Sequence, residues 1–368
     1  MSTRTRADAP VPSAPSAANG KRQQGILRRL RSNYTFNVLM QGLVTIWAVT
    51  TFTFFLIRLM PGNPVQVKID QLMNTQNVTY EQALAIAAGL FEFDPNEPVI
   101  QQYVNYLGKL LTGDLGVSIT SAGTPVLDQI LRFLPWTLFC VGLSLVISFT
   151  FGIILGLLMA FNRGSFLDNV LTGFASVTAG LPDYIVALLI LLIFGVQLQW
   201  FQVGEFRGGV NPNIAPGFTL DYLGSVLKHA FLPVLVYVLG SIGSWMLAMK
   251  SSTISTLGED YITVAQARGL SERRVLTAYV GRNAMLPLLT RLAISVGFVV
   301  SGAVVIEEFF QYPGLGRALY RAIPSRDYTT MQGVFLVVTS AVVLANIASD
   351  LVLGWLDPRV RVGKGGEK

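Results

Sequence analysis

Apolar residues run along this chain in six stretches, each close to the length of a membrane-spanning helix. They cover residues 38–59, 136–161, 170–196, 231–249, 288–306 and 334–356. A bilayer core of about 30 Å is crossed by roughly 20 apolar residues of helix. Because lipid offers the backbone no hydrogen-bond partners, apolar runs of this length are helices. The pattern predicts an all-α, polytopic membrane protein with six transmembrane helices.

Three of these stretches carry features that modify a simple span. The first is longer than the apolar core of a cleaved signal peptide, about 7–15 residues, and no A-x-A-like site follows it. It is therefore interpreted as an uncleaved anchor. Gly180, Leu181 and Pro182 predict a break in the third stretch. Arg291 lies in the fifth and is expected to snorkel to the inner membrane interface.

The segments between the spans divide the chain into five predicted parts. These are a disordered cytoplasmic tail at 1–25, a basic segment with the first transmembrane helix at 26–59, an extracytoplasmic helical subdomain at 60–135, a five-helix core at 136–356 that includes a cytoplasmic loop at 250–287, and a cytoplasmic tail at 357–368. The first tail is rich in Ala, Ser, Pro and Gly and has no hydrophobic periodicity, which is typical of disorder.

The 60–135 segment has a helical pattern of its own. An amphipathic stretch at 79–89 begins with Thr79, a residue suited to cap a helix. Apolar residues also recur at helical spacing over 99–111. The segment has too few apolar residues for a core of its own, so it is expected to lie against the outer membrane face. Two further outside loops are predicted at 197–230 and 307–332.

Composition and charge agree with a membrane protein. Of the 368 residues, 52% are apolar and 13% are charged, against about 25% charged in soluble domains. These values exclude a disordered protein, a soluble two-domain enzyme and a coiled coil. With the N-terminus inside, 17 of the 27 Lys and Arg residues fall in cytoplasmic segments, which predicts that both termini are cytoplasmic. Topology thereby explains the net charge of +6, and no nucleic-acid partner is expected.

The chain carries little that could support catalysis. Cys140 and His229 are its single cysteine and histidine, which excludes an intrachain disulfide, a multi-cysteine metal site and a pair of histidine ligands. It has no G-x-x-x-x-G-K-[ST] phosphate-binding loop, so it is not expected to hydrolyse ATP on its own. The expectation is a protein that is not an enzyme, with no catalytic residue, metal or cofactor on this chain.

Two acidic residues lie inside apolar stretches, where charges are costly and often functional. Asp183 follows Pro182, and two interpretations stay open. Either it faces a wet cavity between helices, or it caps the second half of a broken helix. Asp350, near the end of the sixth stretch, is expected to pair with an arginine or a backbone group near the inner surface.

The cytoplasmic loop shows the most informative local pattern. Glu259 and Asp260 suit the N-terminus of a helix and Gly269 suits its C-terminus. Ala265 and Ala267 are small and leave room for another surface to approach. The pattern predicts a helix–turn–helix on the inner membrane face, and a connector that merely covers the bundle is the simpler alternative.

At this loop the chain resembles a known family. The loop is similar to the "EAA" motif of permease subunits of ABC importers, although Val264 stands at the motif's usual first acidic position. More narrowly, the chain resembles the first permease subunit of the bacterial dipeptide/oligopeptide importer family, over residues 26–361. The segments that carry the resemblance are 58–64 (RLMPGNP), 114–118 (DLGVS), 261–270 (YITVAQARGL) with 286–287 (LP), 307–317 (EEFFQYPGLGR), 326–328 (RDY) and 357–361 (DPRVR).

The resemblance implies a type I ABC importer permease (MetI-like) fold and a set of partners. This chain and a second homologous permease would enclose one path across the bacterial inner membrane, in contact with membrane lipid. Two cytoplasmic ABC ATPase domains would bind ATP and Mg²⁺ and contact the loop. An extracytoplasmic solute-binding protein would deliver the substrate, for which peptides are favoured over nickel complexes or oligosaccharides on family frequency alone.

The resemblance also implies the site residues. Those expected to couple to the ATPase are Glu259, Tyr261, Ala265, Ala267, Arg268, Gly269, Leu270 and Pro287. Those expected to line the translocation path are Asp183, Glu307 and Glu308. Those expected to dock the binding protein are Pro61, Gly62, Asn63, Tyr312, Pro313 and Gly314.

Two other classes of protein compete with the importer hypothesis. A secondary transporter would show internal repeats, paired broken helices and ionisable residues at the midplane. Here one broken helix is predicted and no repeat is visible. A structural or assembly protein of the membrane would use the same loop for another partner. ATP-dependent uptake separates the first two classes, and a missing ATPase partner would favour the third.

Overall fold

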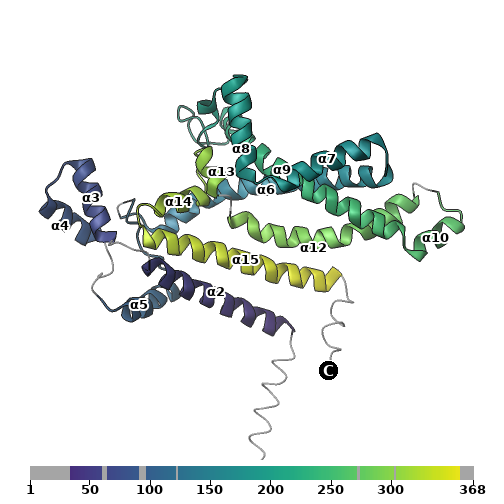
Figure 1. The fold of residues 1–368 in the computed structure, drawn as a ribbon. Coiled ribbons are helices and arrows are strands. Elements are labelled where there is room, and N and C mark those ends of the chain that lie inside the picture. The colour runs from purple at the N-terminus through teal and green to yellow at the C-terminus, as the bar shows by residue number, and fades with distance from the viewer. Residues whose placement is uncertain are drawn as a thin grey trace, which may run out of the picture. The chain divides into compact units, whose positions relative to one another are not determined.

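The computed structural model describes residues 34–59, 64–90, 97–121, 123–271, 274–301 and 304–356. These residues are mainly helical and contain no strand, only an isolated bridge between Val117 and Pro125 (Figure 1). The prediction of an all-α protein is confirmed. The tails predicted at 1–25 and 357–368 lie outside the described residues, and residues 34–44 belong to a separate unit from 45 onward.

Seventeen helical elements are described. The long ones are α2 (Tyr34–Arg58), α6 (Val126–Phe161), α9 (Leu220–Leu257), α12 (Arg282–Phe298) and α15 (Tyr328–Leu356). The shorter ones are α3 (Pro64–Gln76), α4 (Tyr80–Leu90), α5 (Val99–Leu111), α7 (Phe166–Gly180), α8 (Asp183–Ile190), η1 (Leu191–Gln197), η2 (Val203–Phe206), α10 (Asp260–Ala267), η3 (Val275–Gly281), η4 (Val299–Ser301), α13 (Val304–Phe309) and α14 (Leu315–Ala322).

Six predicted spans correspond to five long apolar helices and one bent pair. The pair is α7 followed by α8 and η1, which meet at 106° across a short break. Helix α9 runs for 38 residues, far beyond the predicted 231–249, because its polar ends continue the helix into both flanking loops. The fifth span ends at Ser301 rather than at 306, and the chain then starts the separate helix α13.

The break between α7 and α8 follows from two local residues. Leu181 has extended backbone angles, as the residue before a proline usually does. Pro182 occupies the N-cap of α8. Proline is tolerated there because it has no N–H, and an N–H at the start of a helix would have no partner within the helix. Asp183 is therefore the first residue inside α8, which corrects the interpretation that it caps this helix.

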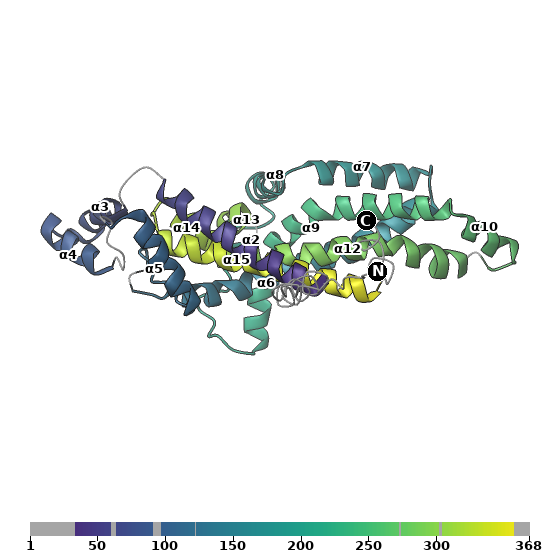
Figure 2. The ribbon, with the colours of Figure 1, turned by 90° about the horizontal axis from the view of Figure 1, so that it is seen from below.

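Helices α6 and α9 share the most extensive helix–helix interface of the described chain. Gly152 and Gly156 of α6 lie directly on the α9 backbone around Trp245 and Met246. Small residues allow such close approach between membrane helices. Helix α7 packs along the same partner, and α12 packs against both α9 and α15, as Figures 1 and 2 show.

The 60–135 segment differs from its prediction in two ways. Helices α3 and α4 bury Ile69, Leu72, Ala83 and Ala87 in a cluster of their own, so the expectation of no local core is wrong for this hairpin. The boundary at 135 falls inside α6, which begins at Val126. Helix α5 spans 99–111 as predicted.

Helix α5 packs against the end of α2. Tyr103 hydroxyl and Thr51 Oγ1 are 2.7 Å apart, and Arg58 Nε donates to Gln102 Oε1 at 2.9 Å. The Arg58 guanidinium also lies 3.8 Å from the ring centre of Phe54, a cation–π contact. These contacts attach the inserted segment, residues 60–135, to the first long helix, α2.

Candidate functional site

The loop between α9 and α12 contains α10, a helix of two turns with a regular C-terminal cap. Gly269 has φ +75°, a left-handed conformation that a glycine adopts at little cost. Its N–H donates to the carbonyl of Gln266, and the N–H of Leu270 donates to that of Ala265. This is the Schellman pattern, so the predicted helix stop at Gly269 is confirmed.

One side of α10 is buried in a hydrophobic cluster of the loop itself. Ile262 and Ala265 pack against Val275 and Val280 of η3, and all four are at most 4% exposed. Leu270 is partly buried at the edge of the same cluster. The expectation that Ala265 opens toward another surface is therefore corrected, because its small side chain serves the packing of α10 onto η3.

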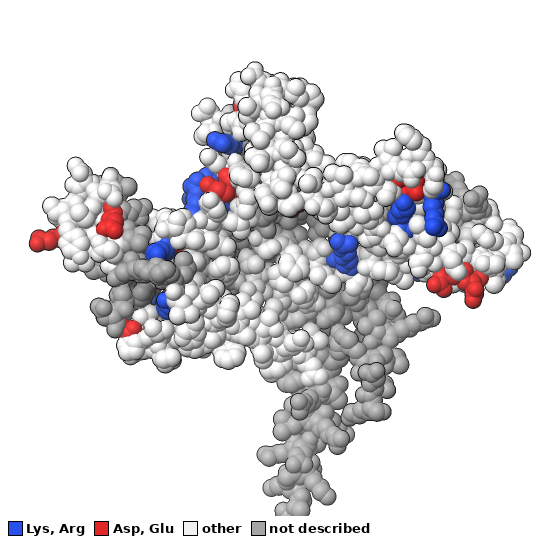
Figure 3. Space-filling model, in the orientation of Figure 1, with Lys and Arg blue, Asp and Glu red and all other residues white. Residues whose placement is uncertain are grey.

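The other side of α10 is open. Tyr261 is 40% exposed and Val264 is 56% exposed. Ala267, Arg268 and Gly269 are exposed as well. Glu259 and Asp260 are exposed at the start of the helix, and Figure 3 shows acidic side chains gathered at this end of the structure. An exposed apolar pair flanked by charges is suited to contact a protein partner.

The loop is tied to both helices that enter and leave it. Asn283 Nδ2 donates to the Tyr261 hydroxyl at 3.1 Å, which joins α10 to α12. Ser252 Oγ donates to the carbonyl of Ala284 at 2.7 Å, which joins α9 to α12. Pro287 lies exposed inside α12, one turn after this contact. Helix α10 thus follows α9 in the chain and is bonded to α12 through Asn283 (Figure 2).

A buried ion pair lies near the same end of α9, and the sequence analysis did not identify it. Lys250 Nζ is 2.6 Å from Asp168 Oδ1, with side-chain exposures of 18% and 5%. Asp168 also accepts hydrogen bonds from the Gly164 N–H and from Thr172 Oγ1. The pair joins the turn before α7 to α9, and two charges 82 residues apart give no local sequence signal.

The break between α7 and α8 places Asp183 against α9. A side chain at Gly240 would collide with the Asp183 carboxylate, so the absence of a Cβ makes room for it. The carboxylate faces a cavity of about 230 Å³. The lining residues are Val141, Ser144, Leu145, Asp183, Tyr237, Ser241, Ser244, Trp245, Arg291, Ser295, Phe298 and Val299. Of the two interpretations left open for Asp183, the structure supports the cavity.

Arg291 also lines this cavity, and its expected snorkelling to the inner interface stays a prediction. Its guanidinium is 4.8 Å from the ring centre of Trp245, a cation–π contact. The cavity serines and Trp245 were not predicted from the sequence. The run of small residues Gly240, Ser241, Gly243 and Ser244 on α9 was the available signal, because small residues at helical spacing mark close contacts in membranes.

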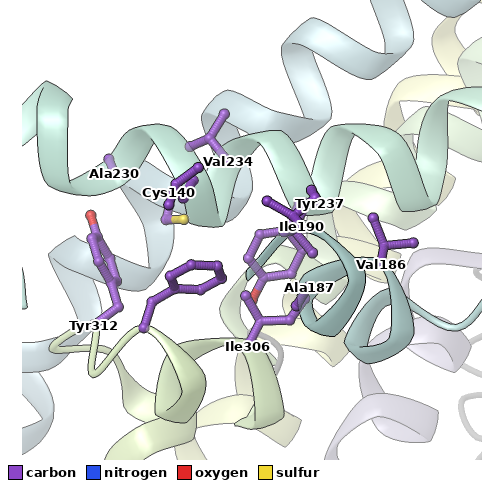
Figure 4. Close-up of a cluster of buried hydrophobic side chains, with 12 residues drawn as sticks. Cys140, Val186, Ala187, Ile190, Ala230, Val234, Tyr237, Ile306 and Tyr312 are labelled. Carbon is purple, nitrogen blue, oxygen red and sulfur yellow. The ribbon is translucent and has the colours of Figure 1, made fainter. Parts of the chain in front are cut away.

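Hydrophobic packing holds the walls of the cavity in place. Figure 4 shows Val186, Ala187 and Ile190 of α8 beside Tyr237 of α9. Tyr237 belongs both to this buried cluster and to the cavity lining. The position of α8, and with it the position of Asp183, is thus fixed by side chains that are at most 8% exposed.

Glu307 lies in a buried network around the turn before α14. Its carboxylate accepts hydrogen bonds from Thr137 Oγ1 at 2.9 Å and from the Arg317 N–H at 3.0 Å, and it packs directly on Gly314. Burial raises the pKa of Glu307, and these hydrogen bonds oppose the rise. Glu308 forms ion pairs with Arg317 and Arg321. A role of either glutamate in the translocation path stays a prediction.

The same turn places the residues expected to dock a binding protein. Tyr312 is fully buried and packs edge-on against Trp136, with ring centres 5.8 Å apart. Gly314 is buried on the Glu307 carboxylate. Only Pro313 is partly exposed. Direct docking by Tyr312 and Gly314 is therefore corrected to a role in building the turn. Pro61, Gly62 and Asn63 lie outside the described residues.

The loop before α9 forms a wide, open hollow. Its volume is about 1120 Å³, and its lining includes Glu205, Asn211, Lys228 and His229. Lys228 pairs with Glu205 at 2.7 Å, and the imidazole Nδ1 of His229 lies 2.7 Å from the carbonyl of Ser225 within α9. Across the described residues, no group of three or more His, Cys, Asp or Glu side chains could hold a metal ion.

Comparisons with known proteins agree with this architecture. The sequence model of the family described as "Binding-protein-dependent transport system inner membrane component" matches residues 152–362. The chain is 34% identical to the di/tripeptide transport system permease protein DppB of Pseudomonas aeruginosa (strain UCBPP-PA14), over 86% of this chain and 95% of that protein.

Two further relatives show the same extent of similarity. The chain is 31% identical to the dipeptide transport system permease protein DppB of Escherichia coli (strain K12), over 92% of this chain and 98% of that protein. It is 29% identical to the protein of the same name from Bacillus subtilis (strain 168), over 88% and 96% of the two chains. The similarity thus covers the long helices, the inserted segment and the loops together.

Proposed function

Since the chain belongs to the family of binding-protein-dependent transport system inner membrane components, we propose that it is the permease subunit of an ATP-driven importer of peptides. The observation that carries the proposal is the extent of the similarity. Relatives named as dipeptide and di/tripeptide permeases are 31–34% identical over 86–92% of this chain. Short peptides are therefore the proposed cargo.

The proposed assembly contains four kinds of subunit. This chain and a second homologous permease form the path, and two cytoplasmic ABC ATPase domains bind ATP and Mg²⁺ below it. A solute-binding protein delivers peptide to the outer surface, where the wide hollow near Lys228 and His229 is an accessible feature. Both termini are placed in the cytoplasm, in accord with the 17 basic residues of the inside segments.

Helix α10 is the proposed contact with the ATPase. Its inner side is held to η3 by Ile262 and Ala265, so the helix moves as one body with the loop. Its outer side offers Tyr261, Val264 and Ala267 to a groove on the partner. Hydrogen bonds from the loop to α12, and from α9 to α12, transmit the motion to the spans, a rigid-body switch of packed helices.

The coupling proposal is tested by substitutions on the exposed side of α10. Ala267→Glu and Gly269→Asp are expected to reduce ATP-driven peptide uptake at least tenfold, because each places a new carboxylate at the proposed contact. Gly113→Asp is the matched control. Gly113 and Gly269 have φ of 76° and 75°, and a Cβ at either would meet nothing within 4 Å.

Backbone strain from Asp is then the same at both positions, about 1–2 kcal/mol, and only the proposed contact differs. The readouts are uptake in proteoliposomes that contain the complete complex, ATPase rate, and retention of the ATPase subunits during purification. If both α10 variants take up peptide at the wild-type rate, the coupling proposal is refuted. Purification of the native chain without any ATPase would count against the importer itself.

A further inference from the structure

The cavity between α6, α8, α9 and α12 contains one carboxylate and one guanidinium on separate walls. We propose that Asp183 receives the amino-terminal ammonium group of the peptide as it passes through the permease, while Arg291 faces the carboxylate end. The inference rests on the proposed function, because it assigns a chemical role to a site along the path of the same cargo.

Asp183 is the acidic residue that lines this cavity. Its side chain has no hydrogen-bond or ion-pair partner among the described residues. The carboxylate lies against Gly240, and Asp183 lines the cavity. A partly buried anion without a partner attracts a cationic ligand more strongly than a surface anion does.

The serine hydroxyls around Asp183 add acceptors to the same cavity. Ser241 Oγ donates to the Tyr237 carbonyl at 2.7 Å, and Ser244 Oγ donates to the Ser241 carbonyl at 2.8 Å. Ser144 and Ser295 donate to carbonyls of their own helices in the same way. A serine hydroxyl that donates its proton to a carbonyl still has lone pairs that can accept a hydrogen bond. The lining therefore offers hydrogen-bond acceptors, which match the three N–H donors of an ammonium group.

Arg291 of α12 supplies a complementary charge to the same lining. The guanidinium of Arg291 contacts the face of Trp245 and forms no ion pair within the described residues. Its N–H groups at the cavity suit a carboxylate. The volume of about 230 Å³ is below the roughly 300–1,000 Å³ of ligand pockets. This chain would thus contact the two charged ends of a short peptide, with the second permease completing the enclosure.

The first test uses charge variants in the complete complex, reconstituted in proteoliposomes with its partner permease, ATPases and binding protein. Uptake of radiolabelled dialanine is expected to fall at least tenfold in Asp183→Asn, which corresponds to about 1.4 kcal/mol. Asp183→Glu restores the charge and is expected to recover most of the uptake. Asp128→Asn, at an exposed acid in the first turn of α6, is the control and should match wild type.

A measurement of ATPase stimulation by the liganded binding protein shows whether each variant complex still assembles. It thereby distinguishes a loss of the peptide contact from a loss of assembly. The stimulation is expected to stay within twofold of wild type in all three variants. Wild-type dialanine uptake by Asp183→Asn would overturn the inference and leave the proposed function standing. Absence of peptide uptake by the wild-type complex would instead refute the proposed function.

A second test compares how fast a cationic and an anionic reagent label a cysteine placed in the cavity. Ser241→Cys adds a thiol beside Asp183, while the native Cys140 is fully buried and does not compete. In the complex, aminoethyl methanethiosulfonate is expected to label this thiol about tenfold faster than the sulfonatoethyl reagent, and Asp183→Asn should abolish the preference. Dialanine should slow the cationic reagent more than N-acetyl-dialanine does. A preference that survives Asp183→Asn, or equal slowing by both peptides, would overturn the assignment.

Discussion

The close contact between α6 and α9 predicts a specific sensitivity at Gly156. A Cβ added there would lie 2.6 Å from the Met246 carbonyl oxygen and 2.7 Å from Met249 Cβ. The first distance is about 0.8 Å short of the 3.4 Å at which ordinary contact begins. The obstacles are backbone and a Cβ, neither of which can rotate away. Gly156→Ala therefore requires α6 and α9 to move apart.

The expected cost follows from two opposing terms. Overpacking a well-packed interface costs typically about 1–3 kcal/mol, whereas replacing glycine by alanine within a helix is favourable by roughly 0.5–1 kcal/mol. The net expectation is a loss of about 1–2 kcal/mol. Gly173 in α7 is the matched control, because it is helical and a Cβ there would meet nothing within 4 Å. Gly173→Ala should be neutral or slightly stabilising.

The assay is thermal unfolding of the purified permease in detergent, followed by uptake in the reconstituted complex. Gly156→Ala is expected to unfold at a lower temperature than wild type, and Gly173→Ala at the same or a higher temperature. If both variants shift in the same direction by the same amount, the reasoning from the α6–α9 contact is refuted. A stable Gly156→Ala variant would also show that the helices separate without cost.

Two further predictions concern the buried hydrogen bonds of Thr137 and Asp327. Thr137→Val removes the acceptor of the Leu315 N–H and a donor to Glu307, each at 2.9 Å, and should lower stability by about 1–3 kcal/mol in thermal unfolding, whereas Thr137→Ser keeps both bonds and should match wild type. Burial would raise the pKa of Asp327, but hydrogen bonds from the Ser118 hydroxyl and nearby backbone N–H groups outweigh it and hold the pKa below 3.8. The stabilisation by Asp327 is therefore complete above about pH 4 and is lost as the pH falls through the folded pKa. Ser118→Ala should move the onset of acid unfolding to higher pH, and an unchanged onset would contradict this account.

Much of the helical architecture was predictable because it depends on local patterns. Apolar length located the spans, and helical spacing located α5 to the residue. Pro182 and Gly269 marked a break and a helix end that the structure confirms. Span ends were less accurate, since α9 continues through polar residues that carry no apolar signal. The importer family was identified from motifs whose order and spacing are themselves properties of the sequence.

The roles of individual motif residues were harder to predict. Ala265 and Tyr312 were assigned to surfaces, yet both are buried within this chain. A short motif shows that a residue matters but does not show which way its side chain points. Orientation depends on the segment packed against the motif, which for Ala265 is η3 and for Tyr312 is the neighbourhood of Trp136.

By itself, the sequence determined the helical class, the membrane spans, the family and the end of helix α10 at Gly269. Only the tertiary structure decided which distant residues meet. It placed Asp183 against Gly240 and in one cavity with Arg291, and it joined Asp168 to Lys250. Helix formation depends on residues within a turn or two of each other. Such pairings depend instead on how whole helices pack, because a small change in packing moves every side chain on the helix.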